Sequence, residues 1–506
     1  MTLTLDRADI QGNVLLPYSR TRFPIGGLLL LHLDRSKGDD APSRWRRFLQ
    51  QLLPQITTSQ LFESKRTRRW KHTPVAPVPR APDVLVNVAF TATGLAALGV
   101  PQATLSGMPL EFLEGMKHRA AVLNDSVEAW DPIWKQEGER HQIDLAIQLR
   151  VNIEPCFHEA YRNAQLEHRD IKDYQDQRIF EQARDLARQC LAEHANAWID
   201  RAEENGIKPL HSLDRGADGA SHGTDSPRWF ETESLIRTRE SDGILAKSGD
   251  PRDLRYGEYE HFGFFDGVAD PIFDGQIPPE DQPEAVIGQG RLEGGSWHPL
   301  AAGEFLLGYG DQAQESPAAA VPLSFSRNGT FLVVRQLHQN VARFEQAIRQ
   351  QLPAFQRWLG SDEAPADLEE ARQLLRAKLV GRWNDGTPLA VAPSFAEWQA
   401  FRDEYRRRLD AADSPDESAK QELKRFKRQF TDIRYEHDDH NGGRCPITSH
   451  IRRSNPRDSG DPRLLDPSDA TARSQAGSVL VNRRRILRRG MTYGPPLAIP
   501  PLTIAS

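Results

Sequence analysis

The order of strand-like and helix-like segments in the first 205 residues constrains the fold of this chain most strongly. Residues 25–33 form an unbroken apolar run typical of a buried strand, and residues 83–90 alternate as a half-buried strand does. Between them, residues 45–53 have the spacing of a helix, and residues 145–151 form another strand-like stretch. This alternation predicts a domain in which strands and helices are mixed.

Two further segments of this half carry helix signals. Thr91 or Thr93 is placed to cap a short helix that runs through Leu98 and stops at Gly99. Residues 179–203 carry apolar side chains at three- and four-residue steps. That spacing predicts a long amphipathic helix.

The length of the chain bears on its division into domains. A chain of 506 residues exceeds one ordinary core, so two domains or two fused repeats are expected. Residues 206–228 are rich in Gly, Asp and Ser and poor in large apolar side chains. We therefore predict an N-terminal module at 1–205, a linker at 206–228 and a C-terminal module at 229–506.

The second half begins in a way that resembles the first. Residues 330–334 predict a strand, and residues 341–352 a helix that ends at Pro353. The segments VLVNVAFTATGLAAL and TFLVVRQLHQNVARF each run from a strand into a helix, and their weak identity raises an internal duplication as a hypothesis. Residues 355–428 are helical and densely charged, which indicates an insertion with solvated helix faces or with a surface that docks a partner.

Charge and cysteine content restrict the class of protein. The 65 basic and 71 acidic side chains are interleaved and give a net charge of -6, which argues against a nucleic-acid partner. The longest apolar run, residues 25–33, is too short to cross a bilayer, and the first residues show no apolar signal core. Three scattered cysteines favour a reducing compartment and neither a disulfide framework nor structural zinc. We expect a cytoplasmic protein without a membrane partner.

The stretch HFGFFDGVADP, residues 261–271, combines glycines, aromatic side chains and a carboxylate. Gly263 and Gly267 bracket Phe264, Phe265 and Asp266. Glycine permits close backbone approach or a positive φ, and an aromatic setting would desolvate a carboxylate. A structural turn built from Asp and Gly would have the same sequence, so this motif alone is compatible with a functional pocket and with a plain turn.

The stretch RCPITSHIRRSNPRD, residues 444–458, places His450 among several arginines. A haem needs an axial ligand for its iron, apolar contacts for the macrocycle and cations for its two propionates. A histidine with neighbouring arginines could supply the ligand and the cations. The alternative is a polar histidine in a basic loop that serves some other acidic ligand.

The stretch RRRILRRGMTYG, residues 483–494, predicts a strand that ends in a glycine-containing turn. Its arginines cannot all be buried on one short strand, so some face solvent. One of them could point into a pocket and stabilise negative charge there.

Taken together and in this order, the three stretches resemble the dye-decolorising peroxidase family. The family's distal GxxDG motif is matched at residues 263–267, its proximal-histidine segment at 445–457 and its distal-arginine segment at 486–494. Weaker similarities are DIQGNVL from Asp9, NGTFLVVRQL from Asn328 and KLVGRWNDGTPL from Lys378. The long insertion resembles the larger, elaborated branch of the family.

The resemblance implies an α+β fold of the dimeric α+β barrel type, with two ferredoxin-like modules of antiparallel sheet and peripheral helices, the haem lying in the second. The family continues past the distal arginine with more strands and a helix, whereas TYGPPLAIPPLTIAS carries four prolines. The second sheet is therefore expected to be incomplete, with an unpaired edge. A shortened chain, a homo-oligomer or second chain that supplies strands, or a rebuilt fold would each account for it.

The resemblance also implies roles for individual residues. His450 is the expected proximal ligand of haem b, iron protoporphyrin IX. Asp266 and Arg488 are expected on the distal face, where the carboxylate relays a proton and the guanidinium stabilises charge on the leaving oxygen. The other expected cofactor-binding residues are Arg335, Arg452, Phe264 and Gly267.

These roles imply a peroxidase that reduces hydrogen peroxide and oxidises dyes or other organic reductants in one-electron steps. Two alternatives remain at this point: a haem-binding or iron-releasing protein without turnover, and a non-enzymatic scaffold whose charged insertion docks a partner. Aromatic side chains of the insertion could relay electrons to the surface, although ordinary packing is the better explanation for each of them: Trp358, Trp383, Trp398 and Tyr405.

Overall fold

The computed structural model describes most of the chain. The described residues are 3–16, 18, 22–60, 81–135, 138, 142–166, 177–210, 228–238, 256–266, 270–277, 279, 282–359, 367–412, 414–464, 466 and 468–494. They form an α+β structure with antiparallel sheets, as expected, of which one is large and two have only two strands. None of the helices in these ranges combines the length and the apolar character that crossing a bilayer requires.

The large sheet occupies the N-terminal half. Its strands β1 (Ile25–Leu33), β2 (Val84–Phe90), β3 (Leu145–Val151) and β4 (Ile207–Leu210) lie in the order β2-β3-β1-β4, and all pairs are antiparallel. This order is the one expected of a ferredoxin-like module. The sequence-predicted strands 25–33 and 145–151 are confirmed to the residue, and the strand predicted at 83–90 begins one residue later.

The predicted boundary between the modules needs correction. Strand β4 lies inside the segment 206–228 that composition assigned to a linker. Strand β5 (Phe230–Glu233), assigned to the second module, pairs with the first residues of β1. Both strands have only four residues; β4 (IKPL) directly precedes the polar segment, and β5 (FETE) is itself polar, so composition identified neither. The first sheet therefore extends to residue 233.

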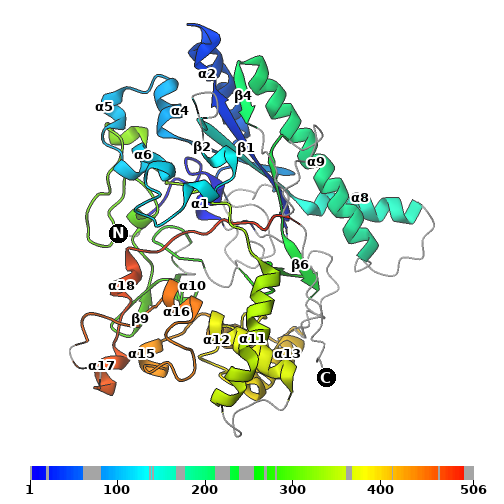
Figure 1. Cartoon of the computed structure of the whole chain (residues 1–506), viewed down its shortest axis with the longest axis vertical. Helices are drawn as coiled ribbons and strands as arrows, with labels where there is room; N and C mark the ends of the chain where they lie inside the picture. The colour runs from blue at the N-terminus through cyan, green and yellow to red at the C-terminus, as the bar shows by residue number, and fades with distance from the viewer. Residues whose placement is uncertain are drawn as a thin grey trace.

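Helices cover the sheet of the first half. Long α9 (Gln177–Glu204) lies against β1, β3 and β4, and α8 (Ile153–Leu166) runs beside it. Helix α2 (Ala41–Leu52) contributes Phe48, whose ring meets Trp198 of α9 edge-on at 5.9 Å between ring centres. Figure 1 shows this sheet and α9 in one half of the molecule. The helices predicted at 45–53 and 179–203 are thus confirmed, with slightly longer bounds.

Short helices follow the sheet strands. Helix α4 (Ala92–Ala97) is capped by Thr91, whose hydroxyl accepts a hydrogen bond from the Gly94 amide at 3.1 Å. Gly99 follows it with φ +88°, so both predicted end signals are confirmed. Four more short helices lie among the described residues of this half: α1 (Gly12–Leu15), α5 (Gln102–Leu105), α6 (Leu110–His118) and α7 (Pro132–Lys135).

The described strands of the second half form two small hairpins. Strand β6 (Leu235–Thr238) pairs with β7 (Tyr256–Tyr259), and β8 (Arg291–Glu293) pairs with β9 (Ser296–His298). The strands predicted at 330–334 and within 483–494 are wrong, because both segments are irregular. Their composition suits a strand, but a strand also needs neighbours for its backbone groups, and the described ranges provide none there.

The charged insertion builds a helical layer with its own core. Trp383 stacks on Trp398 with ring centres 4.6 Å apart, and both indoles are buried with Phe401 and Tyr435. These two tryptophans therefore pack in the interior, whereas Trp358 is 73% exposed. The helices of this layer, visible opposite the sheet in Figure 1, are α11 (Val341–Leu359), α12 (Leu368–Val380), α13 (Phe395–Ala412) and α14 (Glu417–Lys427).

Helix α11 corrects the end predicted at Pro353. It continues for six residues beyond the proline to Leu359. A proline inside a helix removes one backbone hydrogen bond. Phe355 and Leu359 pack against the helical core, which offsets that loss. The remaining short helices are α10 (Gln282–Ala285), α15 (Tyr435–Asp438), α16 (His450–Ser454), α17 (Ala470–Ser474) and α18 (Val479–Asn482).

The N-terminal segment packs into the second half. Ile10 and Leu15 share a buried cluster with Phe273, which stacks on Phe305 with ring centres 4.8 Å apart. Asn328 also donates a hydrogen bond to the Asp9 carboxylate at 2.7 Å. The first residues of the chain therefore belong structurally to the half that carries the candidate site.

Candidate functional site

The loop that carries Asp266 is shaped by a carboxylate just before it. The Glu260 side chain accepts hydrogen bonds from the Phe262 and Phe264 amides at 2.9 and 2.8 Å. Gly263, between those two residues, has φ +87°, a conformation that favours glycine. The Phe265 amide then donates to the Asn384 carbonyl at 2.7 Å. The turn is thus fixed at both ends before the chain reaches Asp266.

Arg376 of α12 holds the same loop from the helical layer. Its guanidinium lies over the Phe264 ring at 5.2 Å and donates to the Phe262 carbonyl. It also pairs with Glu345 of α11, which accepts a second ion pair from Arg372 at 2.5 Å. Burial lowers the pKa of Arg376, and the neighbouring Glu345 carboxylate opposes that effect. The loop is therefore anchored on α11 and α12.

The structure brings Asp266 and Arg488 together across 222 residues of sequence, as a direct ion pair. The Asp266 side chain is 17% exposed and that of Arg488 60% exposed, so the pair lies at an accessible edge. The next residue, Arg489, fixes this segment in place. It donates to the Asn13 carbonyl at 2.6 Å and pairs with Asp270 at 3.1 Å.

His450 is the first residue of α16 and faces solvent. Within the described ranges its imidazole has neither a hydrogen bond nor an ion pair. The preceding loop is held by Asp439, whose carboxylate accepts from the Arg444 and Cys445 amides at 2.9 and 2.8 Å. An exposed imidazole on a well-anchored loop is free to ligate a metal ion.

Arg452, predicted to contact a cofactor, holds this loop. Only 3% exposed, it donates to the Asp439 carboxylate at 3.2 Å and to the Cys445 carbonyl at 3.0 Å. Its guanidinium also lies over the Tyr435 ring at 4.5 Å. These contacts favour a positioning role for Arg452.

The other predicted cofactor-binding residues are placed differently. Arg335 pairs with Asp125 of the first module at 2.5 Å, while Gln336 accepts a hydrogen bond from Trp134 at 2.7 Å. Phe264 is buried beneath Arg376, which indicates a packing role. Gly267 lies outside the described residues.

Helix α12 connects the two parts of the site. Arg376, in its last turns, holds the Asp266 loop, and Gly381 directly after it lies against Ser449 and Ile451 of the His450 segment. Gly381 has φ +90°, and a Cβ there would approach Ile451 Cγ2 to 2.2 Å. Helix α12 therefore contacts both the loop that leads to Asp266 and the segment that contains His450.

Buried charges lie behind the His450 segment. The Asp458 carboxylate accepts from the Tyr435 and Glu436 amides at 2.7 and 3.2 Å, and burial raises its pKa to about 7. Burial also lowers the pKa of Arg382 to about 9, and the nearby Arg457 adds to that effect. In the described ranges no three His, Cys, Asp or Glu side chains converge as a candidate metal cluster.

Sequence reasoning missed Glu260, Arg376 and Asp439. Glu260 left a faint signal, because a carboxylate just before a glycine turn can accept the turn's amides. Arg376 left none, because its contact with Phe262 joins residues 114 positions apart. Asp439 lies among charged residues that composition alone assigns to the surface.

Comparisons of the sequence and of the fold show which known proteins this chain is similar to. Residues 39–167 match the family model described as the DyP dimeric alpha+beta barrel domain. The chain is 30% identical over 248 residues to a dye-decolorizing peroxidase of Mycena epipterygia. This match covers 47% of this chain and 35% of that protein. The chain is also 25% identical over 428 residues to a dye-decolorizing peroxidase of Auricularia auricula-judae, and that match covers 84% of this chain and 57% of that protein.

Solved structures show the same fold. A fungal DyP-type peroxidase from Auricularia auricula-judae superposes with a TM-score of 0.55 at 19% identity, covering 98% of this chain and 76% of that one. An ancestral D-type dye decolorizing peroxidase gives a TM-score of 0.54 at 22% identity with the same coverage. The matches to the curated relatives span 33% to 57% of those proteins. In its matched domain, its curated relatives and its fold, the chain is similar to the dye-decolorising peroxidases.

Proposed function

We propose that this chain is a haem peroxidase that reduces hydrogen peroxide and oxidises dyes or other organic substrates in one-electron steps. The observation that carries the proposal is the partly exposed ion pair of Asp266 with Arg488, whose Asp266 loop contacts α12, the helix that also packs against the His450 segment. The relatives named as dye-decolorizing peroxidases support it, and one similar solved structure is described by its engineered haem pocket.

The residues fit a haem in their chemistry. His450 offers an exposed imidazole without a hydrogen-bond partner in the described ranges, and Arg488 offers an accessible cation. Ile447 and Ile486, one near each of these residues in sequence, expose apolar side chains that a macrocycle would cover. We propose haem b, iron protoporphyrin IX, with His450 as the axial ligand.

A bound haem would supply the redox-active iron at which the peroxide O–O bond is cleaved. Breaking that bond requires a proton to move from one peroxide oxygen to the other. The Asp266 carboxylate accepts this proton and returns it, directly or through water. The Arg488 guanidinium stabilises the negative charge that grows on the leaving oxygen. Arg376 and Glu260 position the carboxylate through its loop.

The three cysteines, all free, support the proposal that the protein is cytoplasmic. The reducing substrate is proposed only as a class, an organic one-electron donor.

Replacement of the proposed ligand tests the proposal. His450→Ala protein, reconstituted with haemin, is expected to lose the Soret absorbance of a histidine-ligated ferric haem. His437→Ala is the matched control, because His437 is exposed on α15 nearby and pairs only with its neighbour Asp438 among the described residues. An unchanged histidine-ligated spectrum in His450→Ala contradicts the assignment. A wild-type protein that stays colourless would support a scaffold, and one that binds haem without dye oxidation would support a haem-binding protein.

A further inference from the structure

A groove outside the candidate site separates the end of α4 from a loop of the second half. One wall is formed by residues 98–104 and the other by residues 322–325, with Arg46 of α2 at one end. The groove is wide open to solvent and has a volume of about 460 Å³. It shares no residue with the Asp266–Arg488 pair or the His450 segment.

A backbone hydrogen bond joins the two walls, from the Val321 amide to the Thr104 carbonyl at 3.2 Å. Within the second wall, the Ala320 amide donates to the Ser326 hydroxyl at 3.1 Å. Gly107 packs so closely on Ala319 that a Cβ there would approach its carbonyl oxygen to 2.4 Å. The groove is therefore preformed, which reduces the ordering that a ligand must impose.

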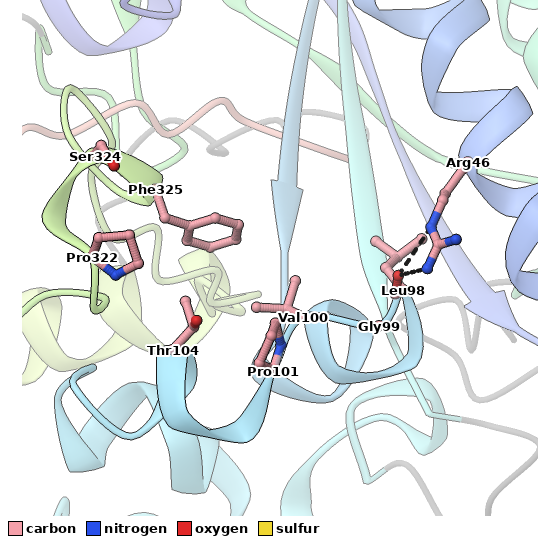
Figure 2. A pocket seen from close by; sticks show the side chains of 9 residues that line it. All are labelled: Arg46, Leu98, Gly99, Val100, Pro101, Thr104, Pro322, Ser324 and Phe325. Atoms are coloured by element: carbon pink, nitrogen blue, oxygen red, sulfur yellow. Dashed lines mark hydrogen bonds between the residues drawn. The ribbon is translucent and has the colours of Figure 1, made fainter.

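Apolar side chains line most of the groove. Val100 and Pro101 lie on one wall, and Pro322 and Phe325 on the other. Phe325 is 47% exposed, so its ring is available to stack on a flat ligand. In Figure 2 Arg46 lies at one end of this row of side chains and Pro322 at the other, with the Phe325 ring pointing inward between them.

The Arg46 guanidinium is oriented but not neutralised. Its Nε and Nη2 atoms donate to the Leu98 carbonyl at 3.3 and 2.9 Å, drawn as dashed lines in Figure 2. Arginine has five N–H donors, and in the described part of the chain no carboxylate pairs with this one. The remaining donors suit the two oxygens of a carboxylate or sulfonate.

We propose that this groove binds a small aromatic anion, its ring between the prolines and Phe325 and its carboxylate or sulfonate on Arg46. The hydroxyls of Thr104 and Ser324, which also line the groove, make no side-chain hydrogen bond within the described ranges and can serve polar substituents. The inference does not rest on the proposed peroxidase activity, because binding is measurable without haem.

Isothermal titration of the full chain with 2-naphthalenesulfonate tests the proposal, with methyl 2-naphthyl sulfone as the uncharged analogue. Arg46→Gln is expected to weaken sulfonate binding by about tenfold and to leave sulfone binding within about twofold, because only the sulfonate uses the charge. Phe325→Ala is expected to weaken both by about fivefold or more through lost stacking.

Arg47→Gln is the matched control, since Arg47 adjoins Arg46 on α2, is exposed and does not line the groove. It removes the same charge and is expected to leave both affinities within about twofold. Arg46→Lys keeps the charge and is expected to retain most of the sulfonate affinity, which separates binding from any local loosening at Leu98. Equal effects of Arg46→Gln and Arg47→Gln, an inert Phe325→Ala, or no saturable binding overturn the proposal.

Discussion

At the scale of single residues, the candidate site depends on charges that the fold holds in place. Asp266 and Arg488 form a partly exposed ion pair. Glu260 and Arg376 bind the backbone of the loop that precedes Asp266 and hold it in position. The first two are expected to touch the substrate. Their replacement should therefore lower turnover by a larger factor than it weakens the binding of haem.

Asp266→Asn is expected to lower kcat/KM for hydrogen peroxide by about 10²-fold or more, because an amide cannot relay the proton. Arg488→Leu should lower it by a similar factor through lost charge stabilisation. Arg484→Leu serves as the control, since Arg484 is an exposed arginine four residues earlier whose side chain, among the described residues, donates only to the Leu480 carbonyl. Steady-state dye oxidation on haem-loaded protein provides the measurement. Full activity in both variants contradicts the assigned roles.

Asp458 gives a pH-dependent contribution to stability. Its folded-state pKa, raised by burial to about 7, lies above the ordinary aspartate pKa of 3.8. The folded protein therefore holds a proton that the unfolded chain has lost between these values, and the free energy of unfolding falls as the pH rises from about 4 to about 7.

Asp458→Asn is expected to remove this decrease in the free energy of unfolding with pH. The decrease amounts to at most ~4 kcal/mol at 1.36 kcal/mol per pKa unit. Urea unfolding at pH 4, 5.5 and 7 measures it. Asp466→Asn changes an exposed carboxyl whose pKa is lowered instead, mainly by its hydrogen bond with Ser468, and should leave the fall in place. An unchanged slope in Asp458→Asn contradicts the prediction.

At the scale of elements, α12 determines where the two parts of the site lie. It holds the Asp266 loop through Arg376 and ends at Gly381, which admits the His450 segment because it has no Cβ. Helix α16 has only five residues and takes its position from what it packs against. A change at the end of α12 should therefore act on His450 without touching it.

Gly381→Ala is expected to destabilise the fold by about 2–4 kcal/mol, combining backbone strain at φ +90° with a clash on Ile451. Gly294→Ala, at φ +55° with nothing within 4 Å of the added Cβ, should cost only about 1 kcal/mol. Denaturant unfolding compares the two, and haemin titration reports the displacement of His450. Equal losses would show that Gly381 is not a contact between α12 and α16.

At the scale of the whole molecule, the first residues of the chain unite the two halves. Ile10 and Leu15 complete the cluster around Phe273, and Arg489 binds the Asn13 carbonyl beside the candidate site. The first sheet also takes β5 from beyond the predicted linker. The halves should therefore unfold together.

Phe273→Ala is expected to lower the free energy of unfolding by about 3–5 kcal/mol, because its ring is fully buried and stacked on Phe305. Phe331→Ala removes a partly exposed ring and should cost less than about 1 kcal/mol. Circular dichroism and tryptophan fluorescence should report one shared transition in both variants. Separate transitions in Phe273→Ala would show that the halves are independent.

The sequence by itself determined the features that depend on local pattern. The strands at 25–33 and 145–151 carry apolar runs long enough to identify them, and Thr91 caps its helix through an amide three residues away. The motif containing Asp266 and the segment containing Arg488 were identified by their resemblance to motifs of one family, in the order of that family. Neither segment by itself predicts that the two side chains form an ion pair.

Only the tertiary structure decided what depends on distant partners. Residues 330–334 have the composition of a strand but lack a neighbour to pair with, so the backbone stays irregular. Arg452 resembled a cofactor contact by its place in the motif, and its burial against Asp439 and Tyr435 follows from loop packing. The physical reason is common to both, because hydrogen bonds and ion pairs between distant segments form only once the whole chain has folded.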